Sequence, residues 1–171
     1  MSLQTPHPIA SFLLSAIENE HQVTKKVLSA LPEEKLSWRP HSKGRSAGEL
    51  AWHIAHSEIW FLEGIAAGQF AAYTEPKAPE RVADIVAYYQ AGLPAVLAKL
   101  RALTPEHFAQ ILTYAGAFSF PAFAYLMLTV SHSIHHRGQL SAYLRTMGEK
   151  VPAIYGGSAD EPFKPPAQAA G

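Results

Sequence analysis

The segment from Phe120 to about Met147 constrains the fold more than any other part of the chain. Its residues have helical apolar spacing, and the apolar side chains fall on nearly every side of such a helix. A helix that is apolar all round is buried among other elements. Ser119 is a candidate N-cap, Pro121 is tolerated in a first helical turn, and Gly148 is a helix-ending signal. We therefore expect a long central helix here, surrounded by other helices.

Three further segments have the apolar spacing of a helix. A capping-box pattern, Ser46-x-x-Glu49, precedes the second segment, and Gly68 follows it. Pro94 lies inside the third segment and should kink it or split it. Together with the central helix they predict an all-α four-helix bundle. The three segments are residues 9–31, 47–67 and about 81–103.

The remaining parts of the chain are shorter or irregular. Thr104-Pro105-Glu106 predicts an extra short helical turn. Residues 111–118 are rich in glycine, alanine and aromatic side chains, and their pattern leads to no assignment. The proline-rich C-terminal tail, residues 149–171, is expected to be coil, ordered at first and then frayed.

Composition limits the class of protein. The chain has 171 residues, 48% hydrophobic and 16% charged, which suits a single domain over residues 1–171 with its core at about 9–148. With 14 basic and 14 acidic side chains the formal net charge is zero, so nothing favours binding to nucleic acid or to an anionic membrane. Cysteine is absent, which excludes thiolate ligands and fits a cytoplasmic location. We find no apolar run of membrane-spanning length and no signal-peptide pattern in residues 1–10.

Two histidines of the central helix point most directly to chemistry. His132 and His136 are four residues apart, which is one helical turn plus about 40°, so their imidazoles share a face. The same row holds Leu128, Leu140 and Tyr143, and we expect it to face the interior. Two buried imidazoles need polar partners, and one divalent cation would serve both.

The second helix offers His53 and His56 as a third ligand. His53 shares a row with Leu50 and Trp60, which predicts an inward position, whereas His56 shares its stripe with two glutamates and should be solvated. We therefore favour His53. For each histidine, a hydrogen-bonded core position without metal is the alternative. His135 lies about 60° from the His132 axis and is not expected to be a ligand.

Three histidines with open coordination positions suit zinc, nickel or iron(II), with zinc as the default. A carboxylate-bridged di-iron site is disfavoured, because neither Glu49 nor Glu58 has a histidine three residues later. No acidic residue is expected in an inward position near the ligands. Arg137 is interpreted as an interhelical ion pair, with Glu58 or Glu63 as its partner, or alternatively as a substrate carboxylate binder.

Four longer segments have a recognisable pattern: residues 47–55 (AGELAWHIA), 132–140 (HSIHHRGQL), 151–160 (VPAIYGGSAD) and the Leu-Pro to Trp-Arg-Pro segment 31–40. These segments resemble the DinB/YfiT-like metalloenzyme superfamily. The resemblance implies an up-down-down-up four-helix bundle, often a homodimer, with a divalent metal held by three histidines at His53, His132 and His136. Characterised relatives include thiol-dependent transferases and isomerases that use bacillithiol, mycothiol or glutathione.

Three functions follow as hypotheses. The first is a metal-dependent transferase that adds a low-molecular-weight thiol to a small electrophile, with no catalytic residue assigned beyond the ligands. Gln139 and Tyr143 would then orient a ligand or substrate, or simply pack within the bundle. The second hypothesis is a metal-dependent hydrolase. The third is a non-enzymatic metal-binding helical module, in which aromatic residues such as Phe61 and Phe118 form core, dimer face or cavity wall.

Overall fold

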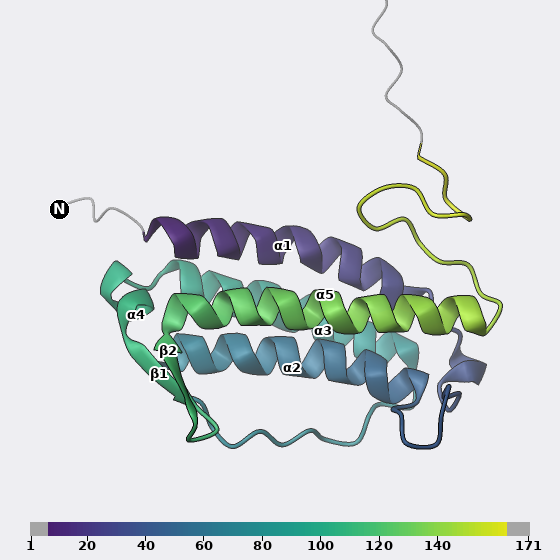
Figure 1. Ribbon diagram of the computed structural model, residues 1–171, viewed down its shortest axis with the longest axis horizontal. Coiled ribbons are helices and arrows are strands. Elements are labelled where there is room, and N and C mark those ends of the chain that lie inside the picture. Colours follow the sequence, from purple (N-terminus) through teal and green to yellow (C-terminus); the bar gives the residue numbers. More distant parts are fainter. Residues whose placement is uncertain (1–6, 164–171) are drawn as a thin grey trace, which may run out of the picture.

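Four long helices form the bundle in this computed structural model, which describes residues 7–163 (Figure 1). The all-α prediction is confirmed, and the first two helices fall within two residues of their predicted bounds. The long helices are α1 (Pro8–Ser29), α2 (Ala47–Ala67), α3 (Val82–Arg101) and α5 (Ala122–Thr146).

The order of the helices around the bundle separates α1 from α2. Helix α1 packs against α3 and α5, and α2 packs against the same two helices, so α1 and α2 occupy opposite corners. Following the chain in Figure 1, α1 and α5 run in one direction, and α2 and α3 run in the other. This is the up-down-down-up arrangement that the resemblance implied.

Because α2 and α3 are parallel, the chain must return along the whole bundle between them. Helix α2 has 21 residues, which at 1.5 Å per residue is a length of about 30 Å. The connecting residues 68–81 contain no regular element, and they run along the outside of the bundle from one end to the other (Figure 1). An α-helix of these residues would span only about 21 Å, so the segment covers the distance only in a more open conformation. We call this segment the return loop.

The helix signals around α2 are satisfied as the sequence predicts. The Ser46 hydroxyl accepts from the Glu49 backbone N–H, and the Glu49 carboxylate accepts from the Ser46 N–H. Gly68 ends the helix with φ 74°, a left-handed conformation that glycine adopts without steric cost. Pro94 does not split α3, which is continuous; its position is exposed, so water can reach the backbone carbonyl that lacks a helical partner.

The segment that had no assignment is a β-hairpin. Strand β1 (Ile111–Tyr114) pairs antiparallel with β2 (Phe118–Pro121), and a short helix α4 (Pro105–Ala109) precedes it. A turn joins the strands, in which Ala115 and Gly116 both have positive φ. The predicted start of the last helix was therefore wrong. Ser119 belongs to β2 rather than capping a helix, and α5 begins only after Pro121.

Helix α5 is less enclosed than its composition predicted. It packs between α1 and α2, but Met127 and Leu128 are 55% and 42% exposed, and Ile134 is also exposed. An apolar sequence all round therefore did not mean burial all round.

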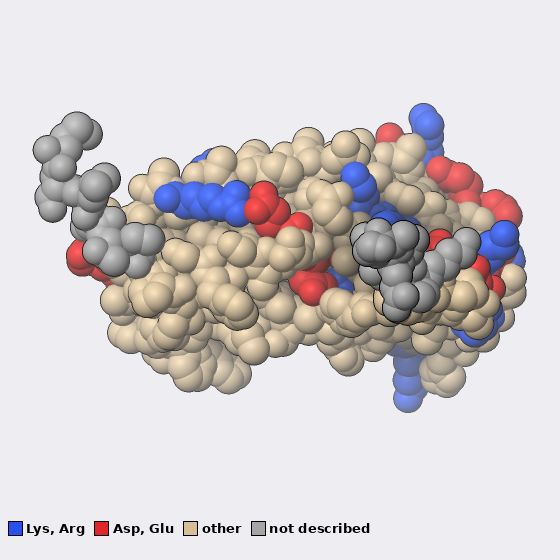
Figure 2. Space-filling view, turned by 90° about the horizontal axis from the view of Figure 1, so that it is seen from above, with Lys and Arg blue, Asp and Glu red and all other residues tan. Residues whose placement is uncertain are grey.

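Seen from above, the charged side chains gather toward the end of the bundle far from the hairpin, and the hairpin end is largely uncharged (Figure 2). The C-terminal residues 149–163 are coil as predicted, and the predicted frayed end, 164–171, lies outside the described residues.

No helix in residues 7–163 combines the length and the apolar character needed to cross a membrane.

A single-turn 3₁₀ helix (Glu33–Lys35) follows α1 and carries Lys35, which donates to the Met147 carbonyl and pairs with Glu149. This contact joins the loop after α1 to the end of α5.

Candidate metal centre

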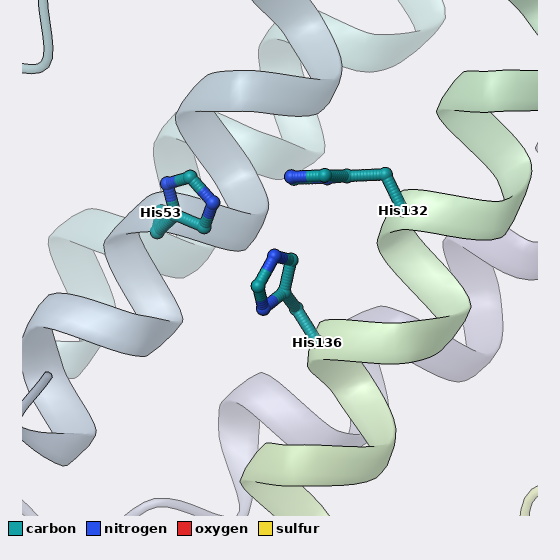
Figure 3. A group of neighbouring side chains, drawn as sticks. All are labelled: His53, His132 and His136. Atoms are coloured by element: carbon teal, nitrogen blue, oxygen red, sulfur yellow. The ribbon is translucent and has the colours of Figure 1, made fainter. Parts of the chain in front are cut away.

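Helices α2 and α5 bring three histidines together in the middle of the bundle. His53 of α2 faces His132 and His136 of α5, and the three rings converge on one point (Figure 3). One ring nitrogen from each residue lies within 4.8 Å of the others. The ring centroids are 4.4 Å apart for the α5 pair and 4.7 Å apart for His53 and His136. We call these residues the histidine triad.

The return loop holds the ring of His53. Its Nδ1 lies 2.7 Å from Glu75 Oε2. The Tyr73 hydroxyl donates to the same oxygen at 2.8 Å. A carboxylate only accepts hydrogen bonds, so Nδ1 of His53 carries the proton and Nε2 keeps a free lone pair. This carboxylate–histidine contact is the outer-shell arrangement that orients metal-binding histidines.

The two histidines of α5 complete the donor set. His136 Nδ1 lies 2.6 Å from the Gln139 side-chain carbonyl. The carbonyl accepts a hydrogen bond from the Nδ1–H, and this again leaves Nε2 with a free lone pair. His132 has a buried Nδ1 without a hydrogen-bond partner among the described residues. A buried polar atom without a partner is costly. A cation bound by the triad would give the neutral imidazole of His132 a polar partner.

Burial keeps the α5 histidines neutral. It is the largest influence on His132 and lowers the pKa of that ring to about 4, with the nearby histidines acting in the same direction. Burial also lowers the pKa of His136, and the hydrogen bond to Gln139 only partly opposes this. Burial tends to raise the pKa of Glu75, but the hydrogen bonds from His53 and Tyr73 and the charge of Arg45 hold it below its ordinary value. The two histidines of α5 therefore offer neutral imidazoles near pH 7, beside an ionised Glu75 carboxylate.

This donor set fits a divalent metal ion. Three neutral imidazole nitrogens from two rigid helices are a ligand set typical of zinc, nickel or iron(II), and they leave coordination positions open. Among residues 7–163 no other group of three or more histidine or acidic side chains comes together in this way.

Comparison with known proteins fits this geometry. A sequence profile of the DinB family matches residues 3–166. The chain belongs to the DinB family. Its curated relatives in Bacillus subtilis (strain 168) include YrdA, 30% identical over 86% of this chain and 89% of the relative, and YjoA, 28% identical over 84% and 94%. Both are uncharacterised proteins.

Solved structures of the family share the bundle. A DinB-like protein from Bacillus cereus is 27% identical, with a TM-score of 0.73 over 84% of this chain and 95% of its own. YfiT from Bacillus subtilis, described as a probable metal-dependent hydrolase with an unusual four-helix bundle topology, has a TM-score of 0.72 over 88% of this chain and 94% of its own. At 17% identity, the similarity to YfiT establishes the fold.

Two other histidines lie near the histidine triad but do not belong to it. His56 is half-buried rather than solvated, because its ring lies against Trp52 and Tyr73, and burial lowers its pKa. The prediction that His56 lies on a solvated stripe was therefore wrong. Its position outside the histidine triad agrees with the sequence analysis. His135 is exposed, and its ring centroid lies 4.8 Å from that of His136.

Arg137 forms the interhelical ion pair that the sequence favoured, but with a different partner. It is 1% exposed and pairs with Glu20 of α1 at 2.5 Å, not with Glu58 or Glu63. Its guanidinium also donates to Thr24 and to the Tyr155 hydroxyl, which ties the C-terminal tail to the bundle. The guanidinium is buried and makes these three contacts, which argues against a role in binding substrate.

Glu75 and Tyr73 are the functional residues that the sequence analysis missed. The expectation that no acidic residue lies near the ligands was wrong, because helical periodicity reports only on residues within helices. Both residues belong to the return loop, and no spacing rule places an extended loop against a helix. The available signal was the length of the segment after Gly68 in a bundle whose second and third helices are parallel.

Proposed function

We propose that His53, His132 and His136 bind one divalent metal ion, with zinc as the first candidate, and that the protein is a metal-dependent enzyme acting on a small molecule. The observation that carries this proposal is the triad, in which two rings are oriented by outward hydrogen bonds and the third has a buried, unpaired nitrogen. A bound divalent metal supplies Lewis acidity, which lowers the pKa of a coordinated thiol or water.

We further propose that the substrate at this centre is a low-molecular-weight thiol, transferred to an electrophile. A charged cleft of about 510 Å³ adjoins the triad, since Glu75 both lines the cleft and contacts His53. Arg45 and Lys77 line it as well. These cations suit the carboxylates that small biological thiols carry. The chain has no cysteine, so the sulfur nucleophile would arrive with the cosubstrate.

The residues of the chain have separate tasks in this proposal. The triad fixes the centre, while Glu75 and Gln139 keep two of the rings in the protonation state that leaves a lone pair inward. Arg45 is 45% exposed and lies 3.4 Å from Glu75, so it can turn toward an incoming carboxylate without leaving a buried partner unpaired. In the transfer, the thiol sulfur bonds to the electrophilic carbon while the bond from that carbon to its leaving group breaks, and the thiol proton and the leaving anion (chloride for a chlorinated substrate) pass to solvent.

A metal-dependent hydrolase is the second candidate, favoured by the similarity of the fold to YfiT. Hydrolysis needs a base for the attacking water. Glu75 is the carboxylate at hand, but it accepts from both His53 and Tyr73 and its pKa is below the ordinary value, so it is a weak base. We therefore place hydrolysis second.

The metal content of the purified protein tests whether the triad binds a metal ion. Protein purified without an affinity tag should contain about one equivalent of a divalent metal by mass spectrometry. His53→Ala and His132→Ala should lose it, while His135→Ala, an exposed histidine on the same helix, should keep it. Absence of metal in wild-type protein, even after reconstitution, would refute the metalloenzyme proposal and leave a helical module.

The thiol is tested next. Metal-loaded protein is incubated with bacillithiol, mycothiol or glutathione together with a chlorinated aromatic electrophile, and thioether product is followed by mass spectrometry. Product that depends on thiol, metal and His132 supports transfer. Turnover of ester or amide substrates in the absence of any thiol would favour the hydrolase instead.

A further inference from the structure

A second cleft of about 440 Å³ lies between the hairpin and the first half of α5. A volume of this size is typical of small-molecule sites. We call it the apolar cleft. The side chains that line it are Tyr114, Phe118, Phe120, Ala124, Tyr125 and Leu128.

The chemistry of the apolar cleft is uniform. Between Glu106 and Arg137 the chain contains no Lys, Arg, Asp or Glu, and all of the lining residues belong to this stretch. The Tyr125 hydroxyl donates to the backbone carbonyls of Leu112 and Phe118, so its polar atom is committed to the hairpin. The cleft therefore offers aromatic and aliphatic surface, and a charged ligand would find no partner there.

The apolar cleft ends one helical turn from the triad. Leu128 precedes His132 by one helical turn on α5, a rise of about 6 Å. The ring of Phe61 of α2 packs between the two, with its centroid 5.8 Å from that of His132 and 5.5 Å from that of Tyr114, so it forms the wall that a ligand would pass. A molecule seated in the cleft would thus reach the metal centre with a short extension.

We propose that the apolar cleft binds an uncharged aromatic or branched aliphatic group of the electrophilic substrate. The reacting carbon then extends past Leu128 toward His132. This assignment rests on the proposed function, because it divides two substrates between the two clefts. The thiol occupies the charged cleft at Glu75, and the apolar substrate occupies the cleft at the hairpin, so the two meet at the triad.

The arrangement of charge supports the division. The charged cleft lies beside His53 and contains Arg45, Glu49, Glu75 and Lys77, whereas the apolar cleft lies beside His132 within an uncharged stretch. On the face drawn in Figure 2, the hairpin end has few charged side chains. Each substrate would therefore be excluded from the site of the other by desolvation cost.

A binding experiment tests the cleft without requiring catalysis. The probe is N-phenyl-1-naphthylamine, an uncharged aromatic molecule whose fluorescence rises in apolar surroundings. Wild-type protein should bind it saturably. Ala124→Phe fills the cleft and should weaken binding at least tenfold. Ala142→Phe makes the same change at an exposed position of α5 outside the cleft and should leave binding unchanged.

A second variant keeps the test decisive if Ala124→Phe does not fold. Leu128→Asn changes the polarity of the cleft wall at a 42% exposed position and should also weaken probe binding. Binding that is absent in wild type, or equal in wild type and both cleft variants, would overturn the proposal. A third outcome would also overturn it: wild type does not bind the probe, and Ala124→Phe changes the sedimentation coefficient. The cleft would then be an interface between two copies of the chain.

Proximity to the metal centre is measured separately. With Co²⁺ added, the ¹⁹F relaxation of 4-fluorotoluene should be enhanced in wild type and not in Ala124→Phe. His132→Ala should lose this enhancement and still bind the fluorescent probe. Probe binding without any Co²⁺ uptake would overturn the metal proposal alone, and Co²⁺ uptake without probe binding would overturn the cleft assignment alone.

Discussion

Glu75 Oε2 lies 2.7 Å from Nδ1 of His53, although the carboxylate belongs to an irregular loop and the imidazole to the middle of a helix. This contact makes the return loop part of the candidate site. The loop crosses the whole bundle because α2 and α3 are parallel, and its course carries Glu75 past the triad.

The first prediction concerns this contact. Glu75→Gln should reduce metal affinity about 10- to 100-fold, because an uncharged amide oxygen is a weaker acceptor than the carboxylate and raises the basicity of the His53 ring less. Competition with a chromophoric chelator measures the affinity. Glu80→Gln is the matched control on the same loop, since Glu80 pairs with Lys77 at the surface, away from the triad. Equal affinity for both variants would show that Glu75 does not support the site.

The second prediction concerns Arg137. Arg137→Met should lower the free energy of unfolding by about 3 kcal/mol, because it leaves Glu20 and Thr24 without their buried cationic partner. Urea denaturation followed by circular dichroism measures the change. Arg145→Met removes an exposed pair with Asp160 and should have little effect. Similar losses in both variants would contradict the assigned role of burial.

The third prediction concerns Glu58, a carboxyl group 2% exposed in the bundle core. Burial raises its pKa to about 7 from 4.5, and the hydrogen bonds from Ser133 and Tyr89 only partly oppose this. Because the folded pKa exceeds the unfolded value, the folded state holds the proton more tightly. This group therefore contributes stability below about pH 4.5, and that contribution is lost as the pH rises to about 7.

Glu58→Gln should remove this pH dependence. The amide oxygen still accepts from Tyr89 and Ser133, and any cost of burying the amide nitrogen is independent of pH. Relative to wild type, the variant should gain up to about 3 kcal/mol between pH 4.5 and pH 8. Unfolding free energies across this range measure the gain. Parallel curves for the two proteins would show that Glu58 does not titrate with a raised pKa.

The fourth prediction compares one substitution at two glycines. Gly68→Ala should destabilise by about 1 kcal/mol, because φ is 74° there and a Cβ would approach the Gln110 side chain. Gly138→Ala should stabilise by about 0.5–1 kcal/mol, because Gly138 lies inside α5 with open space around the added methyl group. Thermal unfolding midpoints should shift in opposite directions. A shift in the same direction would contradict the assigned backbone roles.

The fifth prediction is a homodimer, as the family resemblance implies. Met127 and Ile134 of α5 and Phe12 of the neighbouring α1 are exposed apolar side chains, and we expect a second copy to cover them. Analytical ultracentrifugation should give the mass of two chains, and Met127→Glu should give that of one. Ile111→Lys, also at an exposed apolar residue, is the control on the hairpin. A monomeric wild type would refute this prediction.

The helices of the bundle and the composition of the triad could be read from local pattern. The capping box at Ser46, the stop at Gly68 and the four-residue spacing of His132 and His136 are local features, because a helix fixes the direction of each side chain relative to its neighbours. The inward position of His53 followed from its row with Leu50, whereas His56 is half-buried and not solvated as its pattern predicted. The hairpin was missed because residues 111–121 alternate only weakly and depend on Ala115 adopting positive φ.

The sequence by itself determined which residues form the four helices and which side of each helix carries the histidines, since both follow from short-range periodicity and capping. Only the tertiary structure decided the partners across helices. Glu75 reached His53, Glu20 rather than Glu58 paired with Arg137, and one side of α5 stayed open. These outcomes depend on how parallel helices, a long return loop and a hairpin are placed in space. Such contacts between distant segments leave no periodic signal along the chain.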